Sequence, residues 1–432
     1  MSQPAPARVS PFAVFRNPSF RFVWTGQLVS TIGDALTTLA AGILVYRLTG
    51  SALSVGLMLM ATSLPSLLLG LIGGVIADHY DRRLIMVFSC FVQAALIALI
   101  PIMIVQHVAW LYVLVGLSSC VRQFYSPAYE SVLPELATDE ELAAANSLMS
   151  ISTVGSMALG FAAAGLLASQ MTLSWVFYAD ALTFVFAGLC LLGLRVAHHE
   201  PEEETSVTMV LRNMRKGLDY LFRHRVLRTV MGIGFGLGFA SGILNTLTLP
   251  FTIRVLGATE AVFGIQEALT AIGFITGSLV MASLAARLPE RVWVGLGIGG
   301  MGLGGTLYAL SNTVPIAVAS FTLLGFFNAP AIIAIRLLFQ RKTPARLRGR
   351  VIGAYFVGVE GAIIVGMGVG GLADTLGIRS VLAFASLLTV ALGVAAAVLP
   401  GLNRTVEDEA AVEADPAEDK SGLPPAESVL PD

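Results

Sequence analysis

The chain has little charge and few of the residues from which enzymes and metal sites are built. Only 12% of its 432 residues are Asp, Glu, Lys or Arg, and it contains three cysteines and five histidines. The cysteines lie singly in apolar runs without metal-ligand spacing, and no H-E-x-x-H, G-x-S-x-G or phosphate-binding Gly-Lys-Ser/Thr motif occurs. We therefore expect a protein that is not an enzyme, has no metal or cofactor, and does not use ATP. The net charge of -2 implies no nucleic-acid partner.

Apolar residues are what the chain has in excess. They make up 56% of the sequence, and the mean hydropathy is +0.80, too high for a soluble protein of this length. A run of about 20 apolar residues spans the bilayer. Twelve such runs predict helices at about 20–46, 54–77, 84–105, 109–131, 143–169, 174–195, 227–253, 262–287, 292–311, 315–339, 348–373 and 379–400.

We therefore predict an all-α polytopic membrane protein with 12 transmembrane helices in two six-helix halves. The predicted parts are an N-terminal half (1–196), a cytoplasmic linker (197–226), a C-terminal half (227–404) and an acidic disordered tail (405–432). The linker carries an amphipathic segment with an apolar stripe and with basic residues off it, as in a helix that lies on the inner leaflet. A plain tether between the halves is the alternative.

The basic residues predict the orientation. An even number of spans puts both termini on one side, and that side receives most of the Lys and Arg: Arg82, Arg83, the cluster 212–228, Arg287, Arg291 and five residues between 341 and 350. The other side receives Arg47, Arg254 and Arg379. By the positive-inside rule, both termini are cytoplasmic and the protein is a multi-pass component of the inner (plasma) membrane.

A weak internal repeat supports two related halves. The sequence Phe-Tyr-Ser-Pro-Ala at 124–128 returns as Phe-Phe-Asn-Ala-Pro-Ala at 326–331. Repeated halves are typical of secondary transporters, whose substrate site lies at their interface near mid-membrane.

The charged turn after the second predicted span resembles the loop 2-3 signature of the major facilitator superfamily, G-x-x-x-D-[RK]-x-G-[RK]-[RK]. Gly74, Asp78, Arg82 and Arg83 match it. Two positions depart: His79 replaces a permanent cation, and Asp81 replaces the turn glycine, where we expect Asp to tolerate a left-handed turn. Without the resemblance, the segment is also compatible with a stop-transfer turn of any polytopic protein.

The resemblance extends over nearly the whole membrane body and is greatest to the drug:proton antiporter-3 branch of that superfamily. The residues that carry it are Phe20–Trp24, Gly26, Gln27, Gly33, Asp34, Leu48–Ala52, Leu64–Ser66, Asp78–Arg83, Arg122–Tyr125, Pro127, Ala128, Ala145–Leu148 and Gly349–Val351. The fifth span departs from the antiporter motif, because Phe161 stands at its proline position. The resemblance implies a proton-driven exporter, and it implies that the loop 2-3 motif is a conformational gate in which Asp78 stabilises the outward-facing state.

A few ionisable residues lie inside the predicted spans, where each charge costs about 2.5–3.5 kcal/mol on the lenient insertion scale. Asp34, Arg122 and Glu360 lie deepest, and we expect them to couple transport to protons, with Asp34 as the principal carrier and Glu360 in reserve. Asp180 and Glu267 lie nearer the outer face, where we expect a hydrated vestibule to hold them.

Aromatic, methionine and amide side chains in the spans predict a soft, apolar substrate pocket. Its candidate residues are Trp24, Gln27, Tyr125, Phe235, Phe239, Asn245, Phe327 and Tyr355.

The leading hypothesis is a monomeric secondary transporter that exports amphipathic, drug- or macrolide-like small molecules by proton-coupled alternating access in the lipid bilayer. Two alternatives stay open: export of a siderophore or lipid, and a transport-inactive sensor or scaffold with the same fold. The sequence also leaves open whether the coupling ion is H⁺ or Na⁺.

Overall fold

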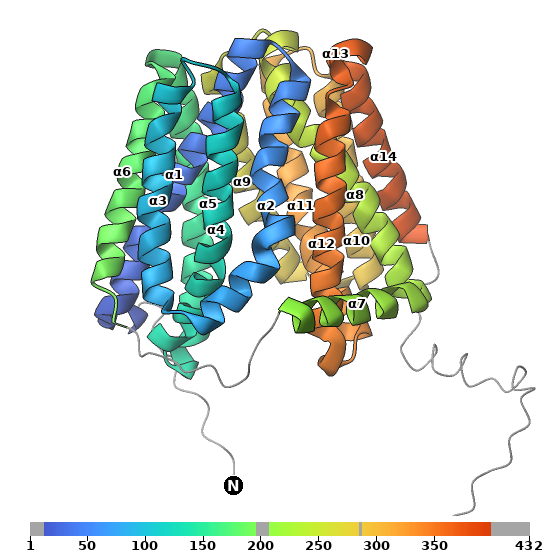
Figure 1. Cartoon of the computed structure of the whole chain (residues 1–432). Coiled ribbons are helices and arrows are strands. Elements are labelled where there is room, and N and C mark those ends of the chain that lie inside the picture. The colour runs from blue at the N-terminus through green and yellow to red at the C-terminus, as the bar shows by residue number, and fades with distance from the viewer. Residues whose placement is uncertain (1–12, 196–206, 285–286, 399–432) are drawn as a thin grey trace, which may run out of the picture.

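The computed structural model describes residues 13–195, 207–284 and 287–398 (Figure 1). The predicted acidic tail (405–432) and residues 197–206 of the predicted linker lie outside the described residues. All regular structure in the described ranges is helical. Twelve long helices are present: α1 (Pro18–Thr49), α2 (Ala52–His79), α3 (Arg82–Met103), α4 (Ala109–Val132), α5 (Asp139–Gln170), α6 (Leu173–Leu192), α8 (Arg225–Pro250), α9 (Glu260–Leu284), α10 (Glu290–Leu310), α11 (Val314–Lys342), α12 (Ala345–Gly370) and α14 (Ile378–Val398).

The all-helical fold is confirmed, and each of the twelve predicted spans corresponds to one of these helices. Eleven of them are long and apolar enough to cross a membrane, counted over the described residues. The exception is α4, which is 24 residues long and carries Arg122, Gln123 and Glu130. It lies in the bundle between α2 and α3 like its neighbours (Figure 1). Its polar residues line a cavity described below.

The helices pack in two groups with the same pairing. In the first group, α1 packs on α5 and α6, and α3 and α2 both pack on α4. In the second group, α8 packs on α12 and α14, and α10 and α9 both pack on α11. The groups meet where α2 packs against α12 and where α5 packs against α9. Buried apolar side chains accordingly form two main clusters, while the exact boundaries of the four predicted parts remain predictions.

A shorter helix of 17 residues does not run with the bundle. Helix α7 (Val207–Arg223) lies across the base of the second group (Figure 1). Its apolar side packs through Leu218 and the buried Leu221, and Gly217 lies against the backbone of α12 at Arg350. We call this base the α7 end of the bundle and the other base the opposite end, where the short helix α13 (Ala373–Leu376) lies.

The turn between α2 and α3 closes in a different way from the one expected. Asp81 has a φ of -57°, so the left-handed turn predicted there is wrong. Instead, Asp81 is the N-cap of α3, and its Oδ1 accepts a hydrogen bond from the Leu84 N–H at 3.1 Å. A short carboxylate at this position satisfies an amide that a glycine would leave free.

Candidate functional site

A polar cavity of about 310 Å³ lies in the first helix group and extends to α12 of the second group. Hydroxyl and amide side chains dominate its wall, and the charged groups on it come from α1, α4 and α12. The lining residues are Asp34, Thr37, Thr38, Thr62, Ser63, Ser66, Gln93, Ile97, Val115, Ser118, Ser119, Arg122, Gln123 and Glu360. All three residues predicted to couple transport to protons therefore share one cavity.

Asp34 and Arg122 form an ion pair in this cavity. The Nη1 atom of Arg122 lies 3.8 Å from Oδ2 of Asp34, a separation longer than a hydrogen bond. The two side chains are 28% and 55% exposed, and what they are exposed to is the cavity. A paired charge is far cheaper inside a membrane protein than an isolated one. The two groups are thus paired, and the cavity leaves room for either to move away.

A second polar cavity of about 200 Å³ adjoins Asp34 and Arg122 and extends along α4. Tyr125 donates a hydrogen bond of 2.9 Å to the Gln27 side-chain oxygen, and the Gln27 amide donates to the Thr31 hydroxyl at 3.2 Å. The Tyr125 ring also stacks on Tyr129. Gln27 and Tyr125 are therefore held in a fixed arrangement beside the ion pair.

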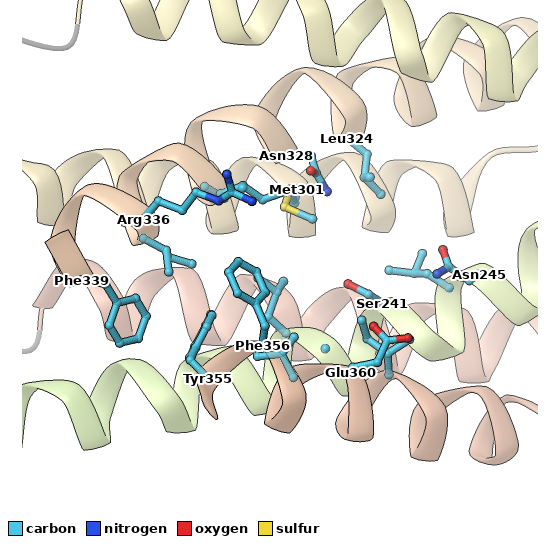
Figure 2. A pocket seen from close by; sticks show the side chains of 18 of the residues that line it. Ser241, Asn245, Met301, Leu324, Asn328, Arg336, Phe339, Tyr355, Phe356 and Glu360 are labelled. Atoms are coloured by element: carbon cyan, nitrogen blue, oxygen red, sulfur yellow. The ribbon is translucent and has the colours of Figure 1, made fainter. Parts of the chain in front are cut away.

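An apolar cavity of about 410 Å³ lies in the second helix group, between α8, α10, α11 and α12. Figure 2 shows Arg336, Phe339 and Tyr355 toward one end of it and Ser241, Asn245 and Glu360 toward the other. The Arg336 guanidinium lies 5.5 Å from the centre of the Phe356 ring, which suits a cation–π contact. The cavity thus has an apolar middle, a cation toward one end and a carboxylate toward the other.

Glu360 belongs to both the polar and the apolar cavity. It lies on α12, which packs against α2 across the boundary between the groups, and its carboxyl faces Ser63 of α2. One side chain thus borders on the polar groups of the first helix group and on the apolar wall of the second.

The structure divides the eight predicted pocket residues. Gln27 and Tyr125 line the polar cavity of about 200 Å³, and Asn245 and Tyr355 line the apolar cavity. The other four do not line them: Trp24 donates a hydrogen bond of 2.9 Å to the Ser152 hydroxyl, and Phe235, Phe239 and Phe327 lie against glycines of neighbouring helices.

The residues of the loop 2-3 motif also separate. Arg82 pairs with Glu135, and the guanidinium of Arg83 donates hydrogen bonds to the carbonyl oxygens of Leu191 and Leu192 at the end of α6. Both arginines therefore tie α3 into its own group. The Asp78 side chain forms no hydrogen bond or ion pair with any residue in the described part of the chain, and a Cβ on Gly74 would meet nothing within 4 Å.

At the opposite end the two groups are joined by direct bonds. The Asp374 carboxylate accepts hydrogen bonds from the Ser51 hydroxyl at 2.6 Å and from the backbone N–H groups of Ala52 and Leu53 at 2.9 and 3.2 Å. Arg47 pairs with Glu260 at 2.8 Å.

Backbones also touch at that end. A Cβ on Gly165 of α5 would lie 2.8 Å from the Cα of Gly264 on α9. At the α7 end, by contrast, a Cβ on Gly349 or Gly353 of α12 would meet nothing within 4 Å. The bundle is closed at the opposite end.

One expectation about the buried charges is wrong. Asp180 does not lie in a hydrated vestibule: it is 0% exposed, enclosed between α6 and α1. Its depth along α6 was estimated from the sequence, but the side of the helix it occupies was not, and that side faces Gly33.

The family model of transmembrane secretion effectors, within the major facilitator superfamily, matches residues 9–420. This chain belongs to that family. It is therefore a multi-pass membrane transporter and not an enzyme.

Relatives of the transporter include efflux pumps. It is 27% identical over 398 residues to the multidrug efflux pump Tap of Mycolicibacterium fortuitum, covering 87% of this chain and 94% of Tap. It is 25% identical over 342 residues to the macrolide efflux protein A of Streptococcus pyogenes, covering 77% and 83% of the two chains. An uncharacterised MFS-type transporter of Bacillus subtilis, YfiS, is 28% identical over 88% of this chain and 93% of its own.

Solved structures share the transporter's fold. The nucleoside transporter NupG superposes with a TM-score of 0.72 at 14% identity, over 87% of this chain and 98% of its own. A bacterial homologue of the human lysosomal transporter Spinster gives a TM-score of 0.66 at 15% identity, over 89% and 95%. At these identities the likeness concerns the fold alone.

Sequence reasoning missed the hydroxyl groups that line the transporter's polar cavity of about 310 Å³. Thr62, Ser63 and Ser66 on α2 and Ser118 and Ser119 on α4 face it. Thr62 and Ser66 on α2, and Ser118 and Arg122 on α4, are each four residues apart, so each pair lies on one side of its helix, and this spacing is the sequence signal for the polar wall.

Proposed function

We propose that the protein exports amphipathic small molecules, drug- or macrolide-like, in exchange for protons. The observation that carries this proposal is the Asp34–Arg122 ion pair in a polar cavity that shares Glu360 with an apolar cavity of about 410 Å³. A cavity of that kind suits a small ligand with a large apolar surface and few polar groups.

The coupling follows from the pair. In hydrocarbon a carboxyl group is more stable as the neutral acid, whereas a nearby guanidinium favours the carboxylate. If Asp34 and Arg122 approach in one conformation and part in the other, the proton affinity of Asp34 alternates with the transport cycle. The separation of 3.8 Å leaves the pair without a direct hydrogen bond, which makes such a parting easier.

We propose further that the α7 end is cytoplasmic. The basic residues that support this orientation lie at that end, as the positive-inside rule requires: Arg82 begins α3, Arg212 is on α7, and Arg341 is in the last turn of α11. With this orientation, the hydrogen bonds and glycine contacts of the opposite end close the outer side. The structure is then an inward-facing state.

Substrate-dependent proton flux in proteoliposomes tests the proposal. A pH gradient is imposed, and uptake of a fluorescent amphipathic dye or of a macrolide is measured together with internal pH, with and without Na⁺. We expect uptake that requires the proton gradient and not sodium. Asp34→Asn should lose proton-driven transport while binding and downhill exchange persist.

Asp219→Asn is the matched control, because Asp219 is an exposed carboxylate on α7. An unchanged pH dependence of transport in Asp34→Asn would contradict the assignment and move the coupling role to Glu360. Transport that ignores the proton gradient in the unaltered protein would contradict the function itself.

A further inference from the structure

Asp180 is a buried carboxyl group to which the coupling scheme gives no role. It lies on α6 and is 0% exposed. Its Oδ1 accepts a hydrogen bond of 3.0 Å from the Thr183 hydroxyl, while its Oδ2 is buried without a partner. In the described part of the chain no Lys, Arg or His forms an ion pair with it.

Enclosure without a paired cation settles the charge of this group. An ionised carboxylate that is taken out of water costs several kcal/mol unless a cation and hydrogen bonds compensate it. The charged groups on neighbouring helices that are close enough to interact electrostatically with it are Asp34 on α1 and Arg122 on α4, and the Cys90 thiol of α3 interacts in turn with Asp34. The guanidinium is already paired with Asp34. The neutral acid is therefore the stable form of Asp180 here.

The packing of α1 is adapted to this carboxyl group. A Cβ placed on Gly33 would lie 2.1 Å from the Asp180 Oδ1 and 2.1 Å from the Thr183 Oγ1. Any side chain at residue 33 would therefore displace the acid. Gly33 directly precedes Asp34, so the site on α1 against which Asp180 packs is one residue away from Asp34.

A hydroxyl group lies between Asp180 and the polar cavity. Thr37 follows Gly33 by one helical turn and lines the cavity that holds Asp34 and Arg122. Its hydroxyl lies close enough to the Asp180 carboxyl to interact with it, yet Thr37 Oγ1 and Asp180 Oδ2 are both buried without a hydrogen-bond partner. Two unpartnered groups facing each other are what a neutral O–H donor and its acceptor need to form a bond after a small shift.

We propose that Asp180 is a second proton-binding residue, which exchanges its proton with the polar cavity through the Thr37 hydroxyl. The O–H bond at Asp180 breaks as a new one forms at the Thr37 oxygen, and the original hydroxyl hydrogen of Thr37 passes to a cavity water or to the Asp34 carboxylate. Asp180 is left as a carboxylate, Asp34 or the water gains the proton, and Thr37 is unchanged. This inference rests on the proposed proton-coupled function and adds a store for the proton behind Asp34.

Infrared spectroscopy on the reconstituted full-length protein tests the proposal. At neutral pH the carbonyl stretch of a protonated carboxylic acid should be present in the unaltered protein and in Asp34→Asn, and should be lost in Asp180→Asn. In heavy water the band should shift as the proton exchanges. Thr37→Val, which keeps the shape but removes the hydroxyl, should slow that shift by about tenfold or more, and Thr37→Ser should restore it.

The outcomes separate this inference from the function on which it rests. A band that persists unchanged in Asp180→Asn, or exchange in Thr37→Val as fast as in the unaltered protein, would overturn the role of Asp180 even if proton-driven transport is intact. Thr37→Val leaves Asp180 in place, so it tests the route even where the asparagine variant does not fold. Conversely, transport that ignores the proton gradient would refute the proposed function while the Asp180 band remains.

The pH dependence of export distinguishes a proton-binding Asp180 from one that has only a structural role. If the residue only packs α6 on α1, Asp180→Asn should export with the pH profile of the unaltered protein. If it stores a proton, the variant should show a less steep dependence of export on pH, because one protonation step is removed.

Discussion

The Asp374 carboxylate lies 2.6 Å from the Ser51 hydroxyl and binds the first two amide N–H groups of α2 across the boundary between the helix groups. An anion at a helix N-terminus is stabilised by the helix dipole and by otherwise unpartnered N–H groups. The loop 2-3 motif predicts the reverse arrangement at the α7 end, with Asp78 of α2 at the start of α12. On this prediction the two aspartates would be inverted counterparts, each engaged in one of the two states.

The first prediction concerns Asp374. Asp374→Ala removes three hydrogen bonds that hold the opposite end closed, and bonds to a charged group are worth about 1.5–3 kcal/mol each at most. We expect the equilibrium to shift by about tenfold or more toward opening at that end. Spin labels at Leu48 and Leu376, both exposed, report it as a longer distance. Asp374→Asn keeps one acceptor oxygen, so its spin-label distance should lie between those of the unaltered protein and of Asp374→Ala. Distances that are unchanged in both variants would show that the Asp374 hydrogen bonds do not hold this end closed.

Asp78→Asn should act in the other direction. A carboxylate at the N-terminus of α12 contributes about 0.3–1 kcal/mol, and more if partly buried, to the outward-facing state in which it forms that contact. Removing its charge should raise the inward-facing population and weaken transport. The same pair of spin labels measures the shift. Wild-type transport with unchanged distances would reduce the motif to a topogenic turn.

The α5–α9 contact gives a steric test of the closed end. Gly165→Val places side-chain atoms where Gly264 and the Glu260 carbonyl lie within 3 Å of an added Cβ, so it should force the opposite end apart. Gly155→Val on the same helix is the matched control, because a Cβ there meets nothing within 4 Å. Thiol labelling from that end should increase in the first variant and not in the second.

The apolar cavity predicts a difference between two aromatic residues. Tyr355 lines the cavity, whereas Phe327 packs against Gly300 of α10. Tyr355→Ala should weaken dye binding by about 10- to 100-fold, as expected for the loss of about 1.5–3 kcal/mol of apolar contact. Phe327→Ala should lower the melting temperature with little change in Kd. Equal losses of affinity in both would argue against this cavity as the binding site.

Topology is tested by labelling single cysteines in intact cells. With the α7 end in the cytoplasm, an impermeant thiol reagent should reach cysteines introduced at Arg47 and Arg379 but not at Arg83 and Arg348. Protection at the first two positions with labelling at the second two would reverse the orientation.

The sequence predicted the helices well because their apolar length is set by the bilayer. Most of the predicted ends fall within a few residues of those of the twelve long helices. Rotation about each helix axis was harder, since helices that are apolar on all sides give no sign of which side faces a cavity. Trp24 and Phe327 were therefore placed in a pocket, and Asp180 in a vestibule, although all three pack between helices.

Side-chain contacts between segments that are far apart in the sequence could not be predicted either. Asp374 directly follows the eleventh predicted span, in the short helix α13, and nothing in the neighbouring sequence indicates that it meets residues 51–53. Hydroxyl groups were also uninformative one by one, because Ser and Thr in helices commonly bond to their own backbone, as Ser147 does to the Ala143 carbonyl at 2.9 Å.

The composition of α4 has a consequence for how the protein is made. Arg122 at mid-membrane opposes insertion by about 2.5–3.5 kcal/mol, and α4 is the one long helix of the described chain that is not apolar enough to be recognised as a span. Its neighbour α3, with a mean hydropathy of 2.4, is more apolar than a membrane-spanning helix needs to be. We therefore expect the two to enter the bilayer during synthesis as a helical hairpin, so that substitutions that make α3 more polar reduce the yield of inserted protein before they affect transport.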